Sequence, residues 1–179
     1  MQALSEPTTE NAPIKAAPAQ GPAAAGTYVT FDLSGQSLGV EVCHVREILD
    51  AVEISRLPNA SPEIEGVIDI RGESIPIVDM GSRLGLPRMA DGEDTRIIVF
   101  ELMHRGEVRA VGVLADRVRD VTEIVADEIE VPPEVVGSSW KADLLRGFAG
   151  HADLLILLLN IEKIFDTGAD SVPLDSMYL

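Results

Sequence analysis

Histidine, cysteine and serine are the side chains here that could act in catalysis or bind a metal. The three histidines, His44, His104 and His151, lie in separate segments with no carboxylate or thiol at ligand spacing, and Cys43 is the one cysteine. A structural zinc site needs more thiols than this. The serines stand outside any G-x-S-x-G motif, and the glycines form no phosphate-binding loop. The sequence therefore predicts no catalytic residues, no metal site and no cofactor.

Carboxylates are abundant, but their number alone does not indicate acid–base catalysis. The chain has 30 Asp and Glu against 14 Lys and Arg, a net charge of −16. So many acids form chance pairs, and a solvated acidic surface explains them better than a catalytic pair does. The same charge repels phosphate backbones and anionic lipid surfaces. We therefore expect no nucleic-acid partner and no direct insertion into a membrane.

Arg71 is the basic side chain whose position indicates a binding role. It lies in EGVIDIRGESIPIVDM, residues 65–80, which reads as a hairpin with Val67 and Val78 on its mixed face. A guanidinium can bind a carboxylate through two hydrogen bonds, and Glu47 in another segment is the candidate partner. The alternative is a surface arginine held by any nearby acid, which contributes 0 to about 1 kcal/mol. Small apolar groups beside charge suit a modest protein interface better than a ligand pocket.

The residues that must position Arg71 form a predicted two-stranded hairpin. A two-residue turn at 72–73, with glycine in its first central position, would place Ile70 opposite Ile75 and Ile68 opposite Ile77. Preceding this hairpin, the spacing of Val45 with the isoleucine and leucine at 48 and 49 favours a single helical turn.

Short strand signals divided by turn residues run through the rest of the chain. Aromatic residues make up 4% of it, so the core must be built from branched aliphatics, which favour strands. Short helices are predicted after Asp79 and after Asn160, each a potential N-cap. Residues 1–26 lack apolar periodicity and are predicted to be a disordered leader, and 167–179 to be a similar tail. The most apolar window, 153–161, is too short to span a membrane.

The two halves of the chain resemble each other weakly. VTFDL matches IVFEL, and LGVEVCHVREI matches VGVLADRVRDV, which indicates two related β units, although short alternating segments also match by chance. The aligned pairs are Phe31 with Phe100, Leu33 with Leu102, Gly39 with Gly112, Val45 with Val118, and Glu47 with Asp120.

The run VCHVREILDAVEISRLPNASPEIEGVIDIRGESIPIVDMGSRLGLP, residues 42–87, strongly resembles the CheW family of bacterial chemotaxis coupling proteins. Its marks are E-I, R-L-P-N before a Pro-containing loop, G-V-I-x-x-R-G, and I-P-I-V-D before a short L-G-L-P helix. Likeness extends over 27–166. The resemblance implies an all-β fold of two five-stranded SH3-like barrels around a shared hydrophobic core, with a few short helices. The first unit would span about 27–92 and the second about 93–166.

The same resemblance implies a non-enzymatic adaptor that couples chemoreceptors to the histidine kinase CheA. Its partners would be the CheW-like regulatory domain of CheA and the cytoplasmic hairpin tip of receptors. The free protein would be a cytoplasmic monomer recruited to receptor arrays at the inner membrane. The alternatives are a CheW-like paralogue serving a non-flagellar or array-modulating pathway, and an unrelated small β enzyme.

By the resemblance, a pair between Arg71 and Glu47 shapes the binding surface of the family. We expect this pair to hold the hairpin and the helical turn in register, so that valines form a groove for a receptor helix. The second unit would line the opposite wall. The predicted partner-binding residues are Val45, Glu47, Ile48, Gly66, Val67, Arg71, Gly72 and Val78, together with Val113, Val118 and Val121 of the second unit.

Overall fold

A computed structural model describes residues 23–88, 90–104, 106–131 and 144–166, and the predicted tail lies outside these ranges. Two α-helices are described, α1 (Met80–Leu84) and α2 (Ile161–Phe165), with 3-10 turns η1 (Val42–His44) and η2 (Ala126–Glu128). The strands are β1 (Gly26–Leu33), β2 (Gln36–Glu41), β3 (Val45–Asp50), β4 (Ile64–Ile70), β5 (Glu73–Val78), β6 (Arg96–His104), β7 (Glu107–Ala115), β8 (Arg117–Ile124), β9 (Ile129–Glu130), β10 (Leu145–His151) and β11 (Leu154–Leu159).

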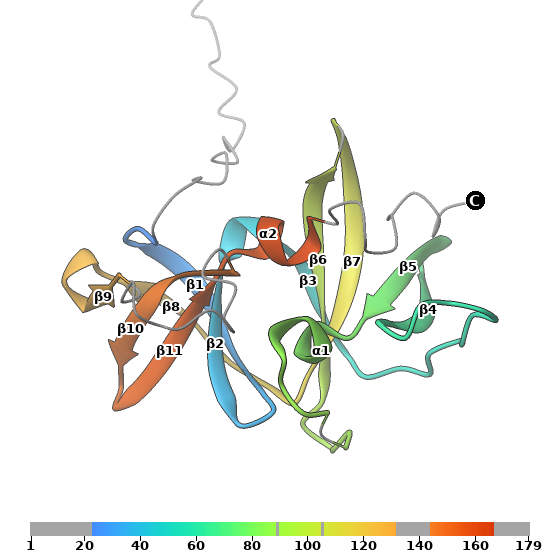
Figure 1. Cartoon of the computed structure of the whole chain (residues 1–179), viewed down its shortest axis with the longest axis horizontal. Coiled ribbons are helices and arrows are strands. Elements are labelled where there is room, and N and C mark those ends of the chain that lie inside the picture. Colours follow the sequence, from blue (N-terminus) through green and yellow to red (C-terminus); the bar gives the residue numbers. More distant parts are fainter. Residues whose placement is uncertain (1–22, 89, 105, 132–143, 167–179) are drawn as a thin grey trace, which may run out of the picture.

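The strands form two sheets side by side, which confirms the mainly β fold (Figure 1). The first sheet has the order β8-β1-β2-β11-β10-β9, and the second has the order β3-β6-β7-β5-β4. The first sheet gains its sixth strand from the two-residue β9, which pairs with β10. None of the described helices is both long and apolar enough to cross a membrane.

Each sheet takes strands from both halves of the chain. The chain leaves the first sheet after β2, enters the second through η1 and β3, and returns to the first with β8 directly after β7. The expected division at residues 92 and 93 is therefore not the division between the sheets. Because of these two crossovers, each sheet needs strands from both halves of the chain.

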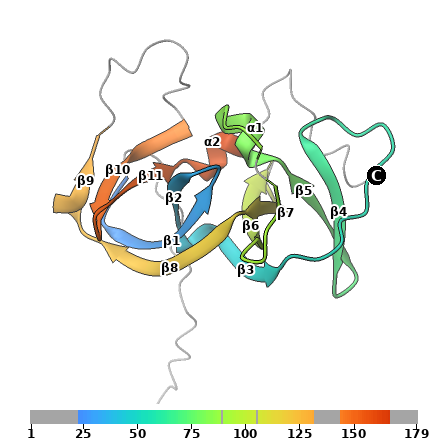
Figure 2. The same ribbon diagram turned by 90° about the horizontal axis from the view of Figure 1, so that it is seen from below.

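The weak sequence repeat corresponds to a repeat of topology. The order β8-β1-β2-β11-β10 in the first sheet matches β3-β6-β7-β5-β4 in the second, with a parallel pair at β2–β11 and at β5–β7. Val118 pairs with Phe31 in one sheet, and Val45 pairs with Phe100 in the other. The exchanged strands β3 and β8 lie along the same side of the molecule (Figure 2). The aligned residues thus occupy equivalent positions.

Three apolar clusters fill the fold. The largest lies between the sheets and joins Phe31 and Leu38 of the first to Phe100 and Val113 of the second, with Phe165 of α2 over it. Two smaller clusters lie inside the individual sheets, around Ile75, Ile77 and Ile97 in the second and around Tyr28, Ile124 and Leu158 in the first. The central strands are buried on both faces as a result, which confirms a shared core.

The helix predictions succeed where a capping side chain marks the start. Asp79 accepts a hydrogen bond from the Ser82 amide (3.0 Å), and Asn160 accepts one from the Lys163 amide (3.3 Å). The predicted helical turn around Val45–Leu49 is wrong, because these residues form β3, with alternating burial and pairing to β6. Residues 1–22 of the predicted leader lie outside the described residues, whereas residues 23–26 belong to the fold, since the Ala23 amide donates to the Arg146 carbonyl (3.1 Å) and β1 begins at Gly26.

Candidate functional site

The β4–β5 hairpin turns at Arg71 and Gly72, one residue earlier than predicted. Both have positive φ, 52° and 84°, as a type I′ turn requires. Ile70 therefore pairs with Glu73, and Ile68 pairs with Ile75, so the predicted register is wrong. Each of these two β4 isoleucines pairs two positions away from its predicted partner on β5. Since side chains alternate between the two faces of a strand, a displacement of two keeps the isoleucines on the same face, toward the inside of the second sheet. The turn places Arg71 at the exposed tip.

Arg71 and Glu47 meet, as the resemblance implied. The Arg71 guanidinium donates to the Glu47 carboxylate at 3.3 Å, with Arg71 78% exposed and Glu47 17%. Glu47 lies in β3 and Arg71 follows β4, so the pair joins the first and last strands of the second sheet. We call this contact between β3 and the hairpin tip the seam. The pair thus links the two edges of one sheet.

A second ion pair reinforces the seam. Arg46 lies 2.8 Å from Glu73 and 3.6 Å from Glu47. Its hydrogen bond to Glu73 and the charge of both carboxylates raise the pKa of Arg46 above its ordinary value. Arg46 occupies an irregularity in the β3–β6 pairing between Val45 and Glu47, which turns it toward the hairpin. Two arginines and two glutamates therefore lie across the seam.

Gly66 lies against the loop between β3 and β4. It is buried, its φ is 153°, and a Cβ there would lie 2.3 Å from the Ser55 carbonyl oxygen. This absence of a side chain lets Ser55 pair with Val67 through two backbone hydrogen bonds of 2.9 Å. Gly72, by contrast, has open space around it. Gly66 therefore positions the loop between β3 and β4.

The predicted valine groove is partly wrong. Val78 and Val113 are 1% and 0% exposed and belong to the shared core, because β5 and β7 are covered on both faces. They cannot offer side chains to a partner in this conformation. Val45 and Val118 are partly buried and pack against the same core. They connect the surface strands to the interior.

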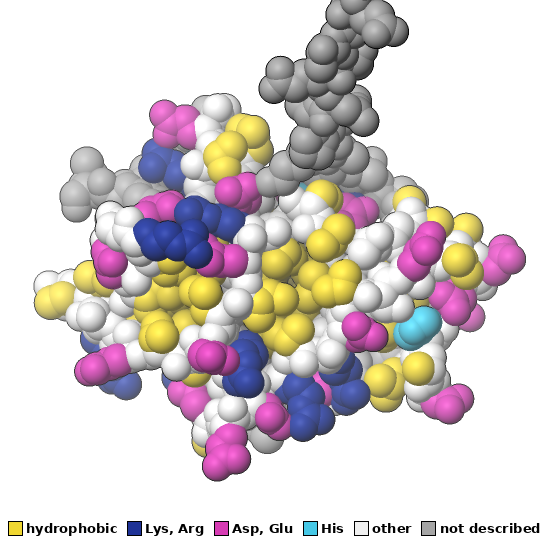
Figure 3. Space-filling model, turned by 180° about the vertical axis from the view of Figure 1, so that it is seen from behind, with side chains coloured by type: hydrophobic (Ala, Val, Ile, Leu, Met, Phe, Trp, Pro, Cys, Tyr) yellow, Lys and Arg dark blue, Asp and Glu magenta, His cyan; other side chains and the backbone are white. Residues whose placement is uncertain are grey.

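The remaining predicted residues lie at the surface. Ile48 on β3 is 38% exposed, Val121 on β8 is 53% exposed, and Val67 on β4 is partly buried. Figure 3 shows the side of the molecule along which β3 and β8 run, where apolar side chains lie between groups of basic and acidic ones. This mixture has the character of a protein interface.

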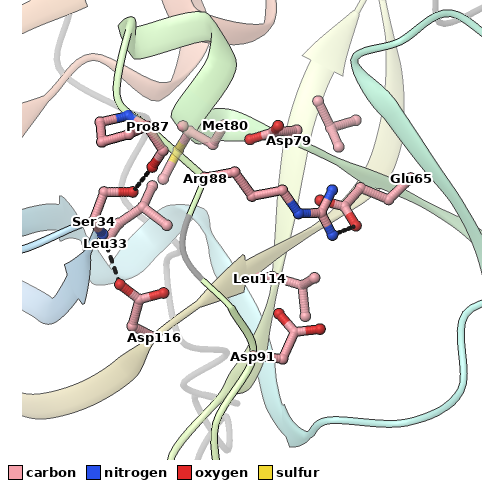
Figure 4. Close-up of a pocket in the computed structure, with 12 residues that line it drawn as sticks. Leu33, Ser34, Glu65, Asp79, Met80, Pro87, Arg88, Asp91, Leu114 and Asp116 are labelled. Carbon is pink, nitrogen blue, oxygen red and sulfur yellow. Dashed lines mark hydrogen bonds and ion pairs between the residues drawn. The ribbon is translucent and has the colours of Figure 1, made fainter.

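A pocket between the sheets is too small for a metabolite. Ser34, Glu65, Arg88 and Asp116 are among its lining residues, and Arg88 pairs with Glu65 at 2.8 Å (Figure 4). Its volume of about 30 Å³ accommodates roughly one water molecule. Ligand pockets span about 300–1,000 Å³.

The sequence-based prediction missed two polar clusters around histidines. His151 lies 3.2 Å from the Thr122 hydroxyl and 3.6 Å from Glu128, and it thereby fastens β10 to β8. His44 lies beside Glu41 and Cys43. The expectation that no histidine has a carboxylate or thiol at ligand spacing is therefore wrong for both. Contacts across the sheet bring Thr122 and Glu128 to His151, while Glu41 and Cys43 are already close to His44 in the sequence.

Comparison with known proteins identifies the family. The model of the CheW-like domain matches residues 27–169. The chain belongs to this family. Its relatives in the CheW family include the chemotaxis protein CheW of Klebsiella aerogenes, 26% identical over 78% of this chain and 81% of the relative. The probable chemotaxis protein CheW of Rhizobium etli is 30% identical over 76% and 85%.

A solved CheW structure has the same fold. The crystal structure of the scaffolding protein TtCheW from Thermoanaerobacter tengcongensis matches with a TM-score of 0.70 and 27% identity, over 84% of this chain and 94% of that one. The CheW family consists of non-enzymatic adaptors, and this chain has their chemotaxis scaffold function. Its partners accordingly belong to chemotaxis signalling.

Proposed function

We propose that this CheW-family adaptor binds both the CheW-like regulatory domain of the histidine kinase CheA and the cytoplasmic hairpin tip of chemoreceptors. The kinase would thereby come under receptor control in arrays on the cytoplasmic side of the inner membrane. The free adaptor would be a monomer, because each binding surface serves a different partner. The observation that supports this proposal is the seam, where Arg71 and Glu47 hold the hairpin tip against β3.

The receptor contact would use the surface around the seam. Ile48 and Val67 supply apolar area, and Arg71 is 78% exposed, so its remaining donors are open to a second carboxylate. On β8, the strand equivalent to β3, Val121 supplies apolar area in the second wall. A receptor helix lying along β3 and β8 would meet both walls.

Val45, Val118, Gly66 and Gly72 would act indirectly. The first two anchor β3 and β8 to the shared core, and the glycines set the loop and turn geometry beside the seam. Substituting any of them would change binding by moving the surface. The kinase domain would bind the first sheet, which takes β8 to β11 from the second half of the chain.

A titration tests the proposal. The labelled full chain is titrated with the kinase regulatory domain and, separately, with a receptor cytoplasmic fragment, using wild type, Arg71→Ala and Lys163→Ala. Lys163 is the control because it is also an exposed cation of an ion pair, 3.8 Å from Asp166, but lies on α2. We expect the wild type to bind both partners, Arg71→Ala to bind the receptor fragment more weakly, and Lys163→Ala to match the wild type.

Each outcome has a distinct meaning. If Arg71→Ala binds both partners as tightly as the wild type does, the seam is not a binding surface and this assignment is overturned. Binding of neither partner by the wild type would transfer the function to a CheW-like paralogue of another signalling pathway. Its partners would then be sought among the products of neighbouring genes.

A further inference from the structure

Three side chains with metal-binding atoms meet where the chain crosses from the first sheet to the second. Glu41 ends β2, Cys43 and His44 lie in η1, and β3 begins at the next residue. Their ligand atoms all lie within 4.8 Å of one another. The Glu41 Oε2 atom is 3.9 Å from the Cys43 sulfur and 3.7 Å from His44 Nε2.

These separations are close to those of bound ligands. Zinc binds thiolate sulfur at about 2.3 Å and imidazole nitrogen or carboxylate oxygen at about 2.0–2.2 Å in a tetrahedron. Ligand atoms around one zinc ion are therefore roughly 3.3–3.7 Å apart by this geometry. The distances between the three atoms need to shorten by a few tenths of an ångström to at most about 1.5 Å.

The carboxylate of Glu41 is held in a suitable orientation. Its Oε1 atom lies 2.9 Å from the guanidinium of Arg146, which is 4% exposed, while its Oε2 atom points to the thiol and the imidazole. The outer partner that commonly fixes a ligating carboxylate is here the ion pair with Arg146. Arg146 also lowers the cost of bringing Glu41 and a thiolate together.

We propose that Glu41, Cys43 and His44 form a binding site for a thiophilic divalent cation of the zinc type. Glu41 Oε2, Cys43 Sγ and His44 Nε2 are three ligands, and water takes the fourth position. Binding replaces the thiol proton, which passes to solvent, with a bond from sulfur to the metal. The site would fasten the crossover and so fix the start of β3, which carries Val45 and Glu47.

The chemistry of the three side chains suits a cation of this type. A carboxylate and an imidazole offer lone pairs to a metal ion, and a thiol that coordinates a divalent ion is deprotonated. The three histidines also differ in setting, because His44 is buried whereas His104 and His151 are only partly buried.

Cobalt substitution provides a direct test. Tag-free full-length protein is titrated with Co²⁺ under reducing, anaerobic conditions while the near-ultraviolet charge-transfer band of a sulfur–cobalt bond is recorded. Cys43 is the one cysteine of the chain, so this band reports only this site. We expect the band to saturate at one cobalt per chain and to disappear when Zn²⁺ is added.

Variants test the other ligands. We expect His44→Gln and Glu41→Gln to weaken Co²⁺ binding at least about tenfold, since loss of even an outer partner costs 10–100-fold. His104→Gln and His151→Gln should bind as the wild type does. Absence of the band from wild-type protein overturns the proposal even if every variant misfolds. An unchanged affinity in well-folded His44→Gln overturns it as well.

Discussion

The guanidinium of Arg71 lies 3.3 Å from the carboxylate of Glu47 and joins opposite edges of a five-stranded sheet. Arg71 is at the tip of the hairpin and mostly exposed, so solvent screens the attraction, which contributes about 0–1 kcal/mol to folding. The pair therefore adds little to the stability of the fold but fixes the hairpin tip against β3, and we propose that this arrangement serves a partner.

A double-mutant cycle tests this role. We expect Arg71→Ala and Glu47→Ala each to weaken receptor binding, and the double variant to lose less than the sum of the two. The unfolding free energy of Arg71→Ala should stay within about 1 kcal/mol of wild type by urea denaturation. Additive losses in binding would contradict a coupled pair. Arg71→Lys keeps the charge and should recover only part of the binding, because Lys lacks the planar donors.

Gly66→Ala should destabilise the chain more than Gly72→Ala does. At Gly66 the new methyl overlaps the Ser55 carbonyl, which costs about 1–3 kcal/mol, and the positive φ adds a similar strain of about 1–3 kcal/mol. At Gly72 a new methyl group meets open space. The substitution there lowers the unfolding free energy only through the positive φ, by about 1–2 kcal/mol.

Hydrogen exchange distinguishes these two glycine variants by location. Gly66→Ala should expose the backbone amides of Ser55 and Val67, which bond to each other's carbonyls. Gly72→Ala should leave both amides protected. Equal protection of Ser55 and Val67 in the two variants would show that the close approach at Gly66 is not what holds the loop.

The short helices and the repeat could be predicted from sequence because their signals are local. Asp79 and Asn160 each cap the helix that follows, and a cap needs only a few neighbouring residues. The sequence alignment of Val45 with Val118 reflects equivalent positions in the fold. Each valine pairs with a phenylalanine on the neighbouring strand of its own sheet. The partnership of Glu47 and Arg71 rests on two distant segments, and resemblance to a family supplied it.

The errors arose where sequence patterns are ambiguous. Arg71 adopts a positive φ that arginine rarely takes, so the sequence favours a turn that begins at Gly72. The segment from Val45 to Leu49 is short enough to fit both a helical and a strand period, and pairing with β6 decides between them. Val78 lies on a strand covered on both faces, and alternation along one strand does not reveal this.

Truncation to alanine should affect stability at Val78 and receptor binding at Val121. Val78→Ala removes two buried methyl groups and should lower the unfolding free energy by about 2 kcal/mol. Val121→Ala removes exposed surface and should change stability by no more than about 0.5 kcal/mol while weakening receptor binding. Urea denaturation and the receptor titration measure the two effects. A stable Val78→Ala variant with lost binding would return Val78 to the binding surface.

Alkaline pH should destabilise the chain through Tyr28 and Cys43. Burial, followed by the Glu41 carboxylate, raises the pKa of both above their ordinary values of 10.0 and 9.0. The folded state therefore holds these protons more tightly than the unfolded state does. The stabilisation is complete below the unfolded values and is lost as pH rises past them.

Thermal denaturation in metal-free buffer across pH 7 to 10.5 measures this loss. The midpoint should fall most steeply above about pH 9, where unfolded Cys43 and then Tyr28 release their protons. Cys43→Ala removes the first of these ionisations, so its midpoint should fall less between pH 8 and 9.5 than that of wild type. Tyr28→Phe should flatten the decline nearer pH 10. An identical slope in wild type and in both variants would assign the alkaline loss to other groups.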